Sequence, residues 1–131
     1  MYSLIIYLII VYISFYLHNI SKTEEIKKKY NKKILLIELI HHFISNYITY
    51  GGILFGYHKF HLIIIVILVI LWFKYNNDCP ITLYCNKKTN QSLNAKFKDL
   101  NYFIKEKINV SYYHILIIII IYDLYFIFKN N

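Results

Sequence analysis

Long apolar stretches alternate with short lysine-rich segments along the whole chain. A helix that crosses a bilayer needs roughly 20 predominantly apolar residues. Four stretches approach that length, and the second and third are separated only by "GYHK", which leaves room for a tight hairpin. The pattern predicts an all-α fold, an integral membrane four-helix bundle in a single domain over residues 1–131, with spans at about 2–18, 34–54, 56–73 and 110–128.

A shorter periodic pattern precedes the last span. Apolar residues recur at spacings of three and four between lysines, which predicts an amphipathic helix over about residues 92–108. Such a helix can lie in the headgroup plane, where anionic lipid attracts each nearby lysine by about 1 kcal/mol. The alternative is a solvated helix that only leads into the last span. The apolar positions are Leu93, Phe97, Leu100, Ile104 and Ile108.

The composition agrees with a membrane protein. Hydrophobic residues make up 58% of the chain, above the share of about 45–50% that is usual for soluble domains. Ile, Lys, Tyr and Asn together form more than half of the residues and no arginine occurs, as expected of an A/T-rich genome. Much of the isoleucine and tyrosine therefore reflects codon usage.

The positions of the lysines predict an orientation. Thirteen of the 15 lie in the connection between the first two spans or in the connection between the last two, and only Lys59 and Lys129 lie elsewhere. Because cytoplasmic loops are enriched in lysine, these connections should face the cytoplasm, with the hairpin and both termini away from it. The first span lacks a basic leader and a cleavage site, so we interpret it as an uncleaved anchor. Topology and lipid then explain the net charge of +8, and no motif indicates nucleic acid.

One face of the second span collects small and polar residues. Their spacing alternates between four and three, so they share one side of a helix that should pack against other helices of the chain or of a homo-oligomer. Gly52 and Gly56 form a small-xxx-small pair that allows close approach of the third span, although Gly51, Gly52 and Gly56 could instead loosen the turn. The stripe contains Glu38, His42, Ser45, Thr49, Gly52 and Gly56.

Ionisable residues inside predicted spans are candidates for function. His42 and His114 lie at similar depths, so two imidazoles could hold a haem there. We favour structural hydrogen bonding of the imidazoles, and a proton or ion path is a third possibility. A single E-x-x-H does not make a di-iron site, which requires two such motifs. The intramembrane polar residues are Glu38, His41, His42, His114 and Asp123.

The hairpin residues have a simpler interpretation. His58, Lys59 and His61 lie at the predicted outer end of the third span. Headgroup anchoring is their expected role, although His61 could reach Asp123 in the last span.

Two cysteines lie in the second lysine-rich connection. Cys79 and Cys85 are six residues apart, and no neighbouring ligands complete a zinc set, so we expect no metal site. A reducing compartment favours free thiols. Pro80 is predicted to end the third helix. No catalytic motif is present, and we expect no enzymatic activity.

Several short motifs occur in a characteristic order between about residues 38 and 108. They are His42, Gly51-Gly52, His61-Leu62, Trp72, Cys79-Pro80-Ile81-Thr82 and "YFIKEKI". This order resembles a family of small bacterial membrane proteins known only as a domain of unknown function, with a His, Gly-Gly, His-Leu and Cys-Pro-Leu-Thr pattern. The resemblance implies a helical membrane domain and brings no activity with it. We therefore expect a structural or assembly component of a membrane, with a haem or redox protein and a proton- or ion-conducting oligomer as alternatives.

Overall fold

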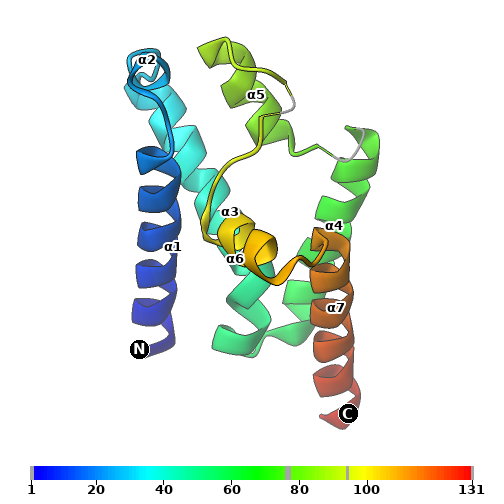
Figure 1. The fold of residues 1–131 in the computed structure, drawn as a ribbon. Coiled ribbons are helices and arrows are strands. Elements are labelled where there is room, and N and C mark those ends of the chain that lie inside the picture. Colours follow the sequence, from blue (N-terminus) through cyan, green and yellow to red (C-terminus); the bar gives the residue numbers. More distant parts are fainter. Residues whose placement is uncertain (1, 76–77, 94, 131) are drawn as a thin grey trace.

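The computed structural model describes residues 2–75, 78–93 and 95–130, and within these ranges it contains helices and no strand (Figure 1). The predicted all-α fold is therefore confirmed. The helices are α1 (Tyr2–Ile20), α2 (Glu24–Lys27), α3 (Lys32–Phe55), α4 (His58–Lys74), α5 (Pro80–Thr89), α6 (Leu100–Ile108) and α7 (Tyr112–Lys129).

The four long helices correspond to the four predicted spans, with every boundary within two residues of the prediction. Two of them, α1 and α7, are long and apolar enough to cross a membrane. Helix α3 is the longest, but it begins with two lysines and carries Glu38, and α4 has only 17 residues.

Local chemistry explains where α3 begins and ends. The side chain of Asn31 accepts a hydrogen bond from the Ile34 N–H at 2.9 Å and so caps the first turn. At the other end Gly56 adopts φ +70°, a left-handed conformation that side chains rarely tolerate, and its N–H donates to the Gly52 carbonyl at 3.1 Å. A Cβ added to Gly56 would meet nothing within 4 Å. The predicted packing role of Gly56 is therefore wrong, because this glycine ends the helix and makes the turn into α4.

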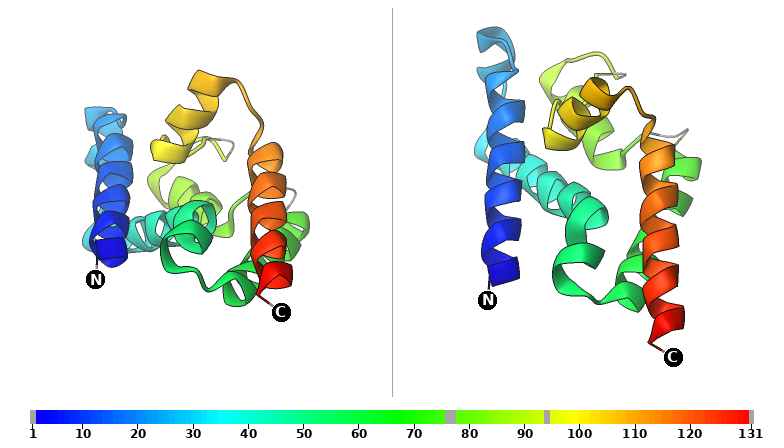
Figure 2. Two further views of the ribbon diagram at one scale, coloured as in Figure 1. Left: turned by 90° about the horizontal axis from the view of Figure 1, so that it is seen from below. Right: turned by 60° about the horizontal axis from the view of Figure 1, so that its bottom comes forward.

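Helix α3 is the central element of the bundle. It packs against α1 along one side and against α4, α5 and α7 elsewhere, while α4 and α7 also pack on each other. Both termini and the turn between α3 and α4 lie at one end of the molecule, and α2 and α5 lie at the opposite end (Figures 1 and 2). This places the lysine-rich α2 and α5 regions together, away from the termini.

The connection between α4 and α7 differs from the prediction in two ways. Helix α4 ends at Lys74, and Pro80 begins a new helix, α5, at a first-turn position where its missing N–H has no cost. Helix α6 begins only at Leu100, where Asp99 accepts a hydrogen bond from the Tyr102 N–H at 2.8 Å. The helix predicted over residues 92–108 is thus wrong in its first half, in which Asn94 lies outside the described residues.

Polar residues lie inside this bundle and apolar residues lie outside. The side chains of Glu38, His42 and Asp123 are 0% exposed, whereas Ile118 is 64% exposed and Phe128 74%. Apolar clusters exist, but each has only three fully buried members among the described residues. The distribution is the inverse of a soluble core, in which charged residues are almost never fully buried.

Candidate functional site

Glu38 is the centre of a buried ionic cluster that joins α1 to α3. Its Oε1 lies 2.6 Å from Lys22 Nζ, and Lys22 also donates to Oε2 at 2.7 Å. His18 Nε2 lies 2.5 Å from Oε1, although the angles are not those of a hydrogen bond. Burial lowers the pKa of the Lys22 amine, and the hydrogen bond to Glu38 opposes this shift. The sequence places Glu38 on the polar stripe of the second span but does not identify this lysine.

His18 also contacts the segment that precedes α6. Its Nδ1 accepts a hydrogen bond from the Lys98 N–H at 3.0 Å. The N–H hydrogen of the ring is therefore on Nε2, which faces Glu38. The ring of Phe97 lies beside it, with centroids 4.4 Å apart. His18 of α1 thus contacts both α3 and the segment of residues 95–99.

His42 bonds to α1 and not to Glu38. Its Nδ1 lies 3.1 Å from the hydroxyl of Ser14, and the same hydroxyl accepts the Leu100 N–H at 3.3 Å. His42 Nε2 is buried and has no hydrogen-bond partner in the described part of the chain. The stripe predicted on α3 therefore faces α1 at this level, close to the first residue of α6.

The predicted pair of haem ligands does not form. His114 is exposed and its Nδ1 lies 2.5 Å from the hydroxyl of Ser111 on the adjoining turn. His42 is completely buried beside α1. Matching depth along two helices suggested a facing pair, but the two side chains point to different surroundings, so the bis-histidine geometry is wrong.

Asp123 is the centre of a second buried cluster, which joins α3, α4 and α7. Its Oδ2 lies 2.6 Å from His61 Nδ1, and its Oδ1 lies 2.8 Å from His58 Nδ1. His61 Nε2 faces the backbone carbonyls of Tyr47 and Ile48 at 2.9 and 3.1 Å. Carbonyl oxygens only accept, so this nitrogen donates. The side chain of His61 is 1% exposed and contacts Asp123 in the interior. The headgroup role expected for His61 is therefore wrong.

Gly52 makes room for this cluster. A Cβ on Gly52 would lie 2.5 Å from Asp123 Oδ1 and 2.8 Å from His61 Nδ1. The close approach expected at this glycine is therefore made by two polar side chains. Gly51 is also buried, but the three atoms nearest to its added Cβ belong to the ring of Tyr47 on the same helix, at 2.9–3.1 Å.

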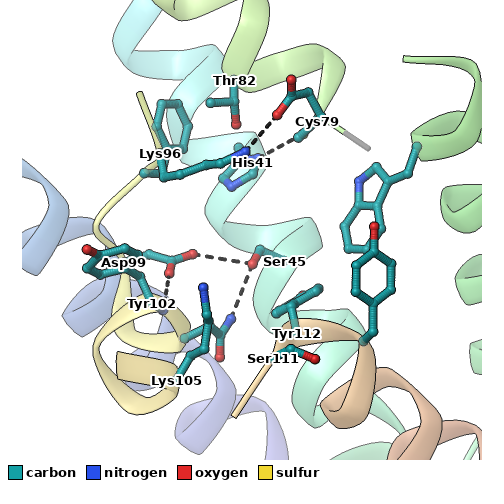
Figure 3. Close-up of a pocket in the computed structure, with 15 residues that line it drawn as sticks. His41, Ser45, Cys79, Thr82, Lys96, Asp99, Tyr102, Lys105, Ser111 and Tyr112 are labelled. Carbon is teal, nitrogen blue, oxygen red and sulfur yellow. Dashed lines mark hydrogen bonds and ion pairs between the residues drawn. The ribbon is translucent and has the colours of Figure 1, made fainter. Parts of the chain in front are cut away.

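Further residues of the predicted sites, including Ser45 and Cys79, line a cavity of about 340 Å³ where helices α3, α4, α5, α6 and α7 meet (Figure 3). His41 and Cys79 both line it and are in contact, with Sγ 3.4 Å from His41 Nδ1. Lower in the view of Figure 3, Ser45 donates to Asp99 at 3.4 Å. Burial raises the pKa of the Asp99 carboxyl. The lining also includes Trp72, Thr82, Lys96, Asn101, Tyr102, Lys105, Ser111 and Tyr112.

The two other stripe residues and the second cysteine have structural placements. Thr49 donates to the carbonyl of Ser45 one turn earlier, at 3.1 Å. Cys85 is completely buried in a small cluster with Ile34 and Phe97. Burial raises the pKa of the Cys85 thiol to about 11. Both cysteines are free thiols in this structure.

Several residues of these clusters were missed because their partners are remote in sequence. Ser14, His18 and Lys22 follow each other at four-residue spacing at the end of the first span. That spacing was the available signal, since it places all three on one face of a helix that would meet the polar stripe of α3. Asp99 and Phe97 carried no such signal, because their contacts come from a segment without regular secondary structure.

Comparisons with protein-family models, curated proteins and solved structures found no match. The resemblance to a family of unknown function therefore stays a prediction based on the motifs alone.

Proposed function

We propose that this chain is a multi-pass integral membrane protein, with α1, α3, α4 and α7 as its spans, and that it serves as a structural or assembly component of a membrane. The inverted distribution of polarity carries this proposal. Soluble monomers rarely expose apolar patches beyond a few hundred Å², whereas here many large apolar side chains of α1, α4 and α7 are exposed and few are buried. Lipid accepts that surface without cost.

The interior polar clusters support the structural part of the proposal. The Glu38 cluster joins α1 to α3, and the Asp123 cluster joins α3, α4 and α7. Helices in lipid gain no hydrophobic free energy by associating, so packing and interhelical hydrogen bonds hold them together. Groups that connect different helices in this way fit a scaffold.

The anionic lipid partner is proposed on the basis of α6. This helix exposes Phe103, Ile104 and Ile108 next to Lys105 and Lys107. Apolar side chains beside lysines are typical of a helix that lies in the headgroup plane. The proposed interfacial helix is shorter than the sequence indicated, but its composition is the same.

The orientation is tested by glycosylation in microsomes. Asn90 lies in an Asn-Gln-Ser sequon and is exposed at the end of α5. If the lysine-rich end faces the cytoplasm, Asn90 should remain unmodified, while a sequon in a C-terminal extension should be glycosylated. The protein should also remain in the membrane during alkaline carbonate extraction. A glycan on Asn90 would reverse the orientation, and release by carbonate would refute the membrane proposal.

A second candidate function, a proton or ion path in an oligomer, is favoured by the ionisable groups buried along α3. Glu38 and His42 lie on this helix, and Asp123 contacts it at Gly52, nearer the other end. Flux across proteoliposomes tests this candidate. Glu38→Gln and Asp123→Asn should each reduce a proton current if it exists, and an absence of current in the unmodified protein would exclude the path.

A further inference from the structure

The cavity where helices α3, α4, α5, α6 and α7 meet is lined by a thiol, that of Cys79, in contact with an imidazole, that of His41. Cys79 is partly exposed, and its Sγ lies 3.4 Å from His41 Nδ1, which is within hydrogen-bond distance for sulfur (Figure 3). The His41 ring packs edge-on against Phe97, with centroids 4.6 Å apart and an interplanar angle of 87°. A thiol in contact with an oriented imidazole is the arrangement that activates cysteine nucleophiles.

Backbone donors lie next to the thiol. Cys79 is the N-cap of the ten-residue helix α5, and its side chain makes no capping hydrogen bond. The first N–H groups of a helix have no partner within it. Pro80 carries no N–H, so Ile81 and Thr82 provide the nearest of these donors. They are available to stabilise a negative oxygen that forms on a carbonyl attacked by Cys79.

The surroundings of the thiol suit a lipid-derived acyl group. At about 340 Å³ the cavity has the size of a ligand pocket. Its lining includes the aromatic rings of Trp72, Phe97 and Tyr112 together with Lys96 and Lys105. It also lies between the last turns of α4 and the first turn of α7, where both proposed spans reach the lysine-rich face. Juxtamembrane cysteines are frequent sites of S-acylation.

We propose that Cys79 is an acylation site, at which the thiol paired with His41 accepts a long-chain acyl group from an acyl thioester. This inference rests on the membrane proposal above. His41 Nδ1 takes the thiol proton while Sγ forms a bond to the carbonyl carbon of the donor. The bond between that carbon and the donor sulfur then breaks, and the departing thiolate receives the proton from His41. The products are an S-acyl cysteine and a free thiol, and no oxidant or reductant is consumed.

The test uses the purified full-length protein in detergent with an alkyne-tagged palmitoyl-coenzyme A. The unmodified protein should acquire a label that hydroxylamine removes, because hydroxylamine cleaves thioesters. Cys79→Ser should lose the label. His41→Gln should slow labelling about 100-fold, the lower end of the range for a lost general base, because the thiol is intrinsically reactive. Cys85→Ser is the matched control and should label normally, since Cys85 is completely buried.

Two measurements separate a chemical role of His41 from a structural one. The fluorescence of Trp72 and the elution volume report whether the His41→Gln protein is folded. Raising the pH supplies thiolate without a base, so labelling of a folded His41→Gln protein should recover at alkaline pH. The proposal is overturned if the unmodified protein takes no hydroxylamine-labile label, if the label is on Cys85, or if the folded His41→Gln protein labels at the normal rate. A protein that resists carbonate but takes no label would refute only the acylation site.

Discussion

Gly52→Ala should weaken the bundle although alanine is the better helix former. The new Cβ would lie 2.5 Å from Asp123 Oδ1 and 2.8 Å from His61 Nδ1, distances that real Cβ atoms do not adopt. Either the Asp123–His61 pair must move away from α3 or α3 must move away from α7. Both movements stretch the hydrogen bonds from His61 Nε2 to the carbonyls of Tyr47 and Ile48.

The opposing terms differ enough to give the sign. Replacing a helical glycine by alanine gains about 1 kcal/mol of helix propensity. Overpacking of a filled interior costs about 1–3 kcal/mol, and separation of a buried ion pair costs about 3–5 kcal/mol. If the Asp123 cluster shifts as a unit, the net loss is small. If the contact between Asp123 and His61 breaks, we expect a loss of about 2–4 kcal/mol, which is the second cost less the propensity gain.

Trp72 makes this loss measurable. It is the single tryptophan of the chain, and its ring packs on Tyr112 across the contact between α4 and α7, with centroids 5.3 Å apart. Reversible denaturation in mixed micelles, followed by tryptophan emission, gives the free energy of unfolding. Gly51→Ala is the comparison variant, because the three atoms nearest to its Cβ, at 2.9–3.1 Å, belong to the ring of Tyr47 and not to the Asp123 cluster.

A double-mutant cycle decides whether the carboxylate is the cause. In an Asp123→Ala background the space beside Gly52 is partly empty, so Gly52→Ala should cost less than it does in the unmodified protein. Equal costs of Gly52→Ala in both backgrounds would refute the argument that Gly52 accommodates the Asp123 cluster.

The same denaturation assay tests the other interior groups. Lys22→Met should cost about 3–5 kcal/mol because it leaves Glu38 charged and buried, whereas Lys27→Met, in an exposed pair, should cost less than about 1 kcal/mol. Burial raises the pKa of Asp99 above 3.8, so ionisation of this carboxyl lowers the stability of the folded protein as the pH rises. Asp99→Asn should therefore stabilise the protein at pH 7. This gain should vanish below pH 3.8, where the carboxyl is protonated in both the folded and the unfolded state. The purified protein should show no Soret absorption, and His42→Gln should unfold at nearly the same denaturant concentration as the unmodified protein, since one hydrogen bond to a hydroxyl is at stake.

The apolar pattern was sufficient to predict the four long helices, and the reason is physical. Runs near 20 residues with few charges leave a helix as the one conformation that satisfies the backbone in lipid. The short helices were harder, because their boundaries depend on single side chains. Pro80 is predicted to end a helix but begins one, since proline is also compatible with a first turn.

In the buried clusters, the sequence predicted the residues of α3 but not their partners on other elements. The periodicity of α3 placed Glu38, His42 and Gly52 on an inward face, and burial of all three agrees with that prediction. Their partners could not be derived, because nothing local indicates that Lys22 meets Glu38 or that Asp99 reaches Ser45 over 54 positions. His114 was paired with His42 from depth alone, and depth does not determine which way a side chain faces.

The buried imidazoles have a common geometry that explains their presence among so many isoleucines. An imidazole has two nitrogens on opposite edges of one rigid ring, so it can contact two different elements at once. His61 uses one nitrogen for Asp123 of α7 and the other for carbonyls of α3. His18 uses one for the backbone at Lys98 and turns the other towards Glu38 of α3. A lysine or serine offers a single polar atom, which cannot reach two partners that lie on different sides of the ring, and an unpaired buried group costs about 1–3 kcal/mol. Where three elements meet in an apolar interior, histidine therefore satisfies more buried partners with fewer flexible bonds than the other polar side chains of this sequence.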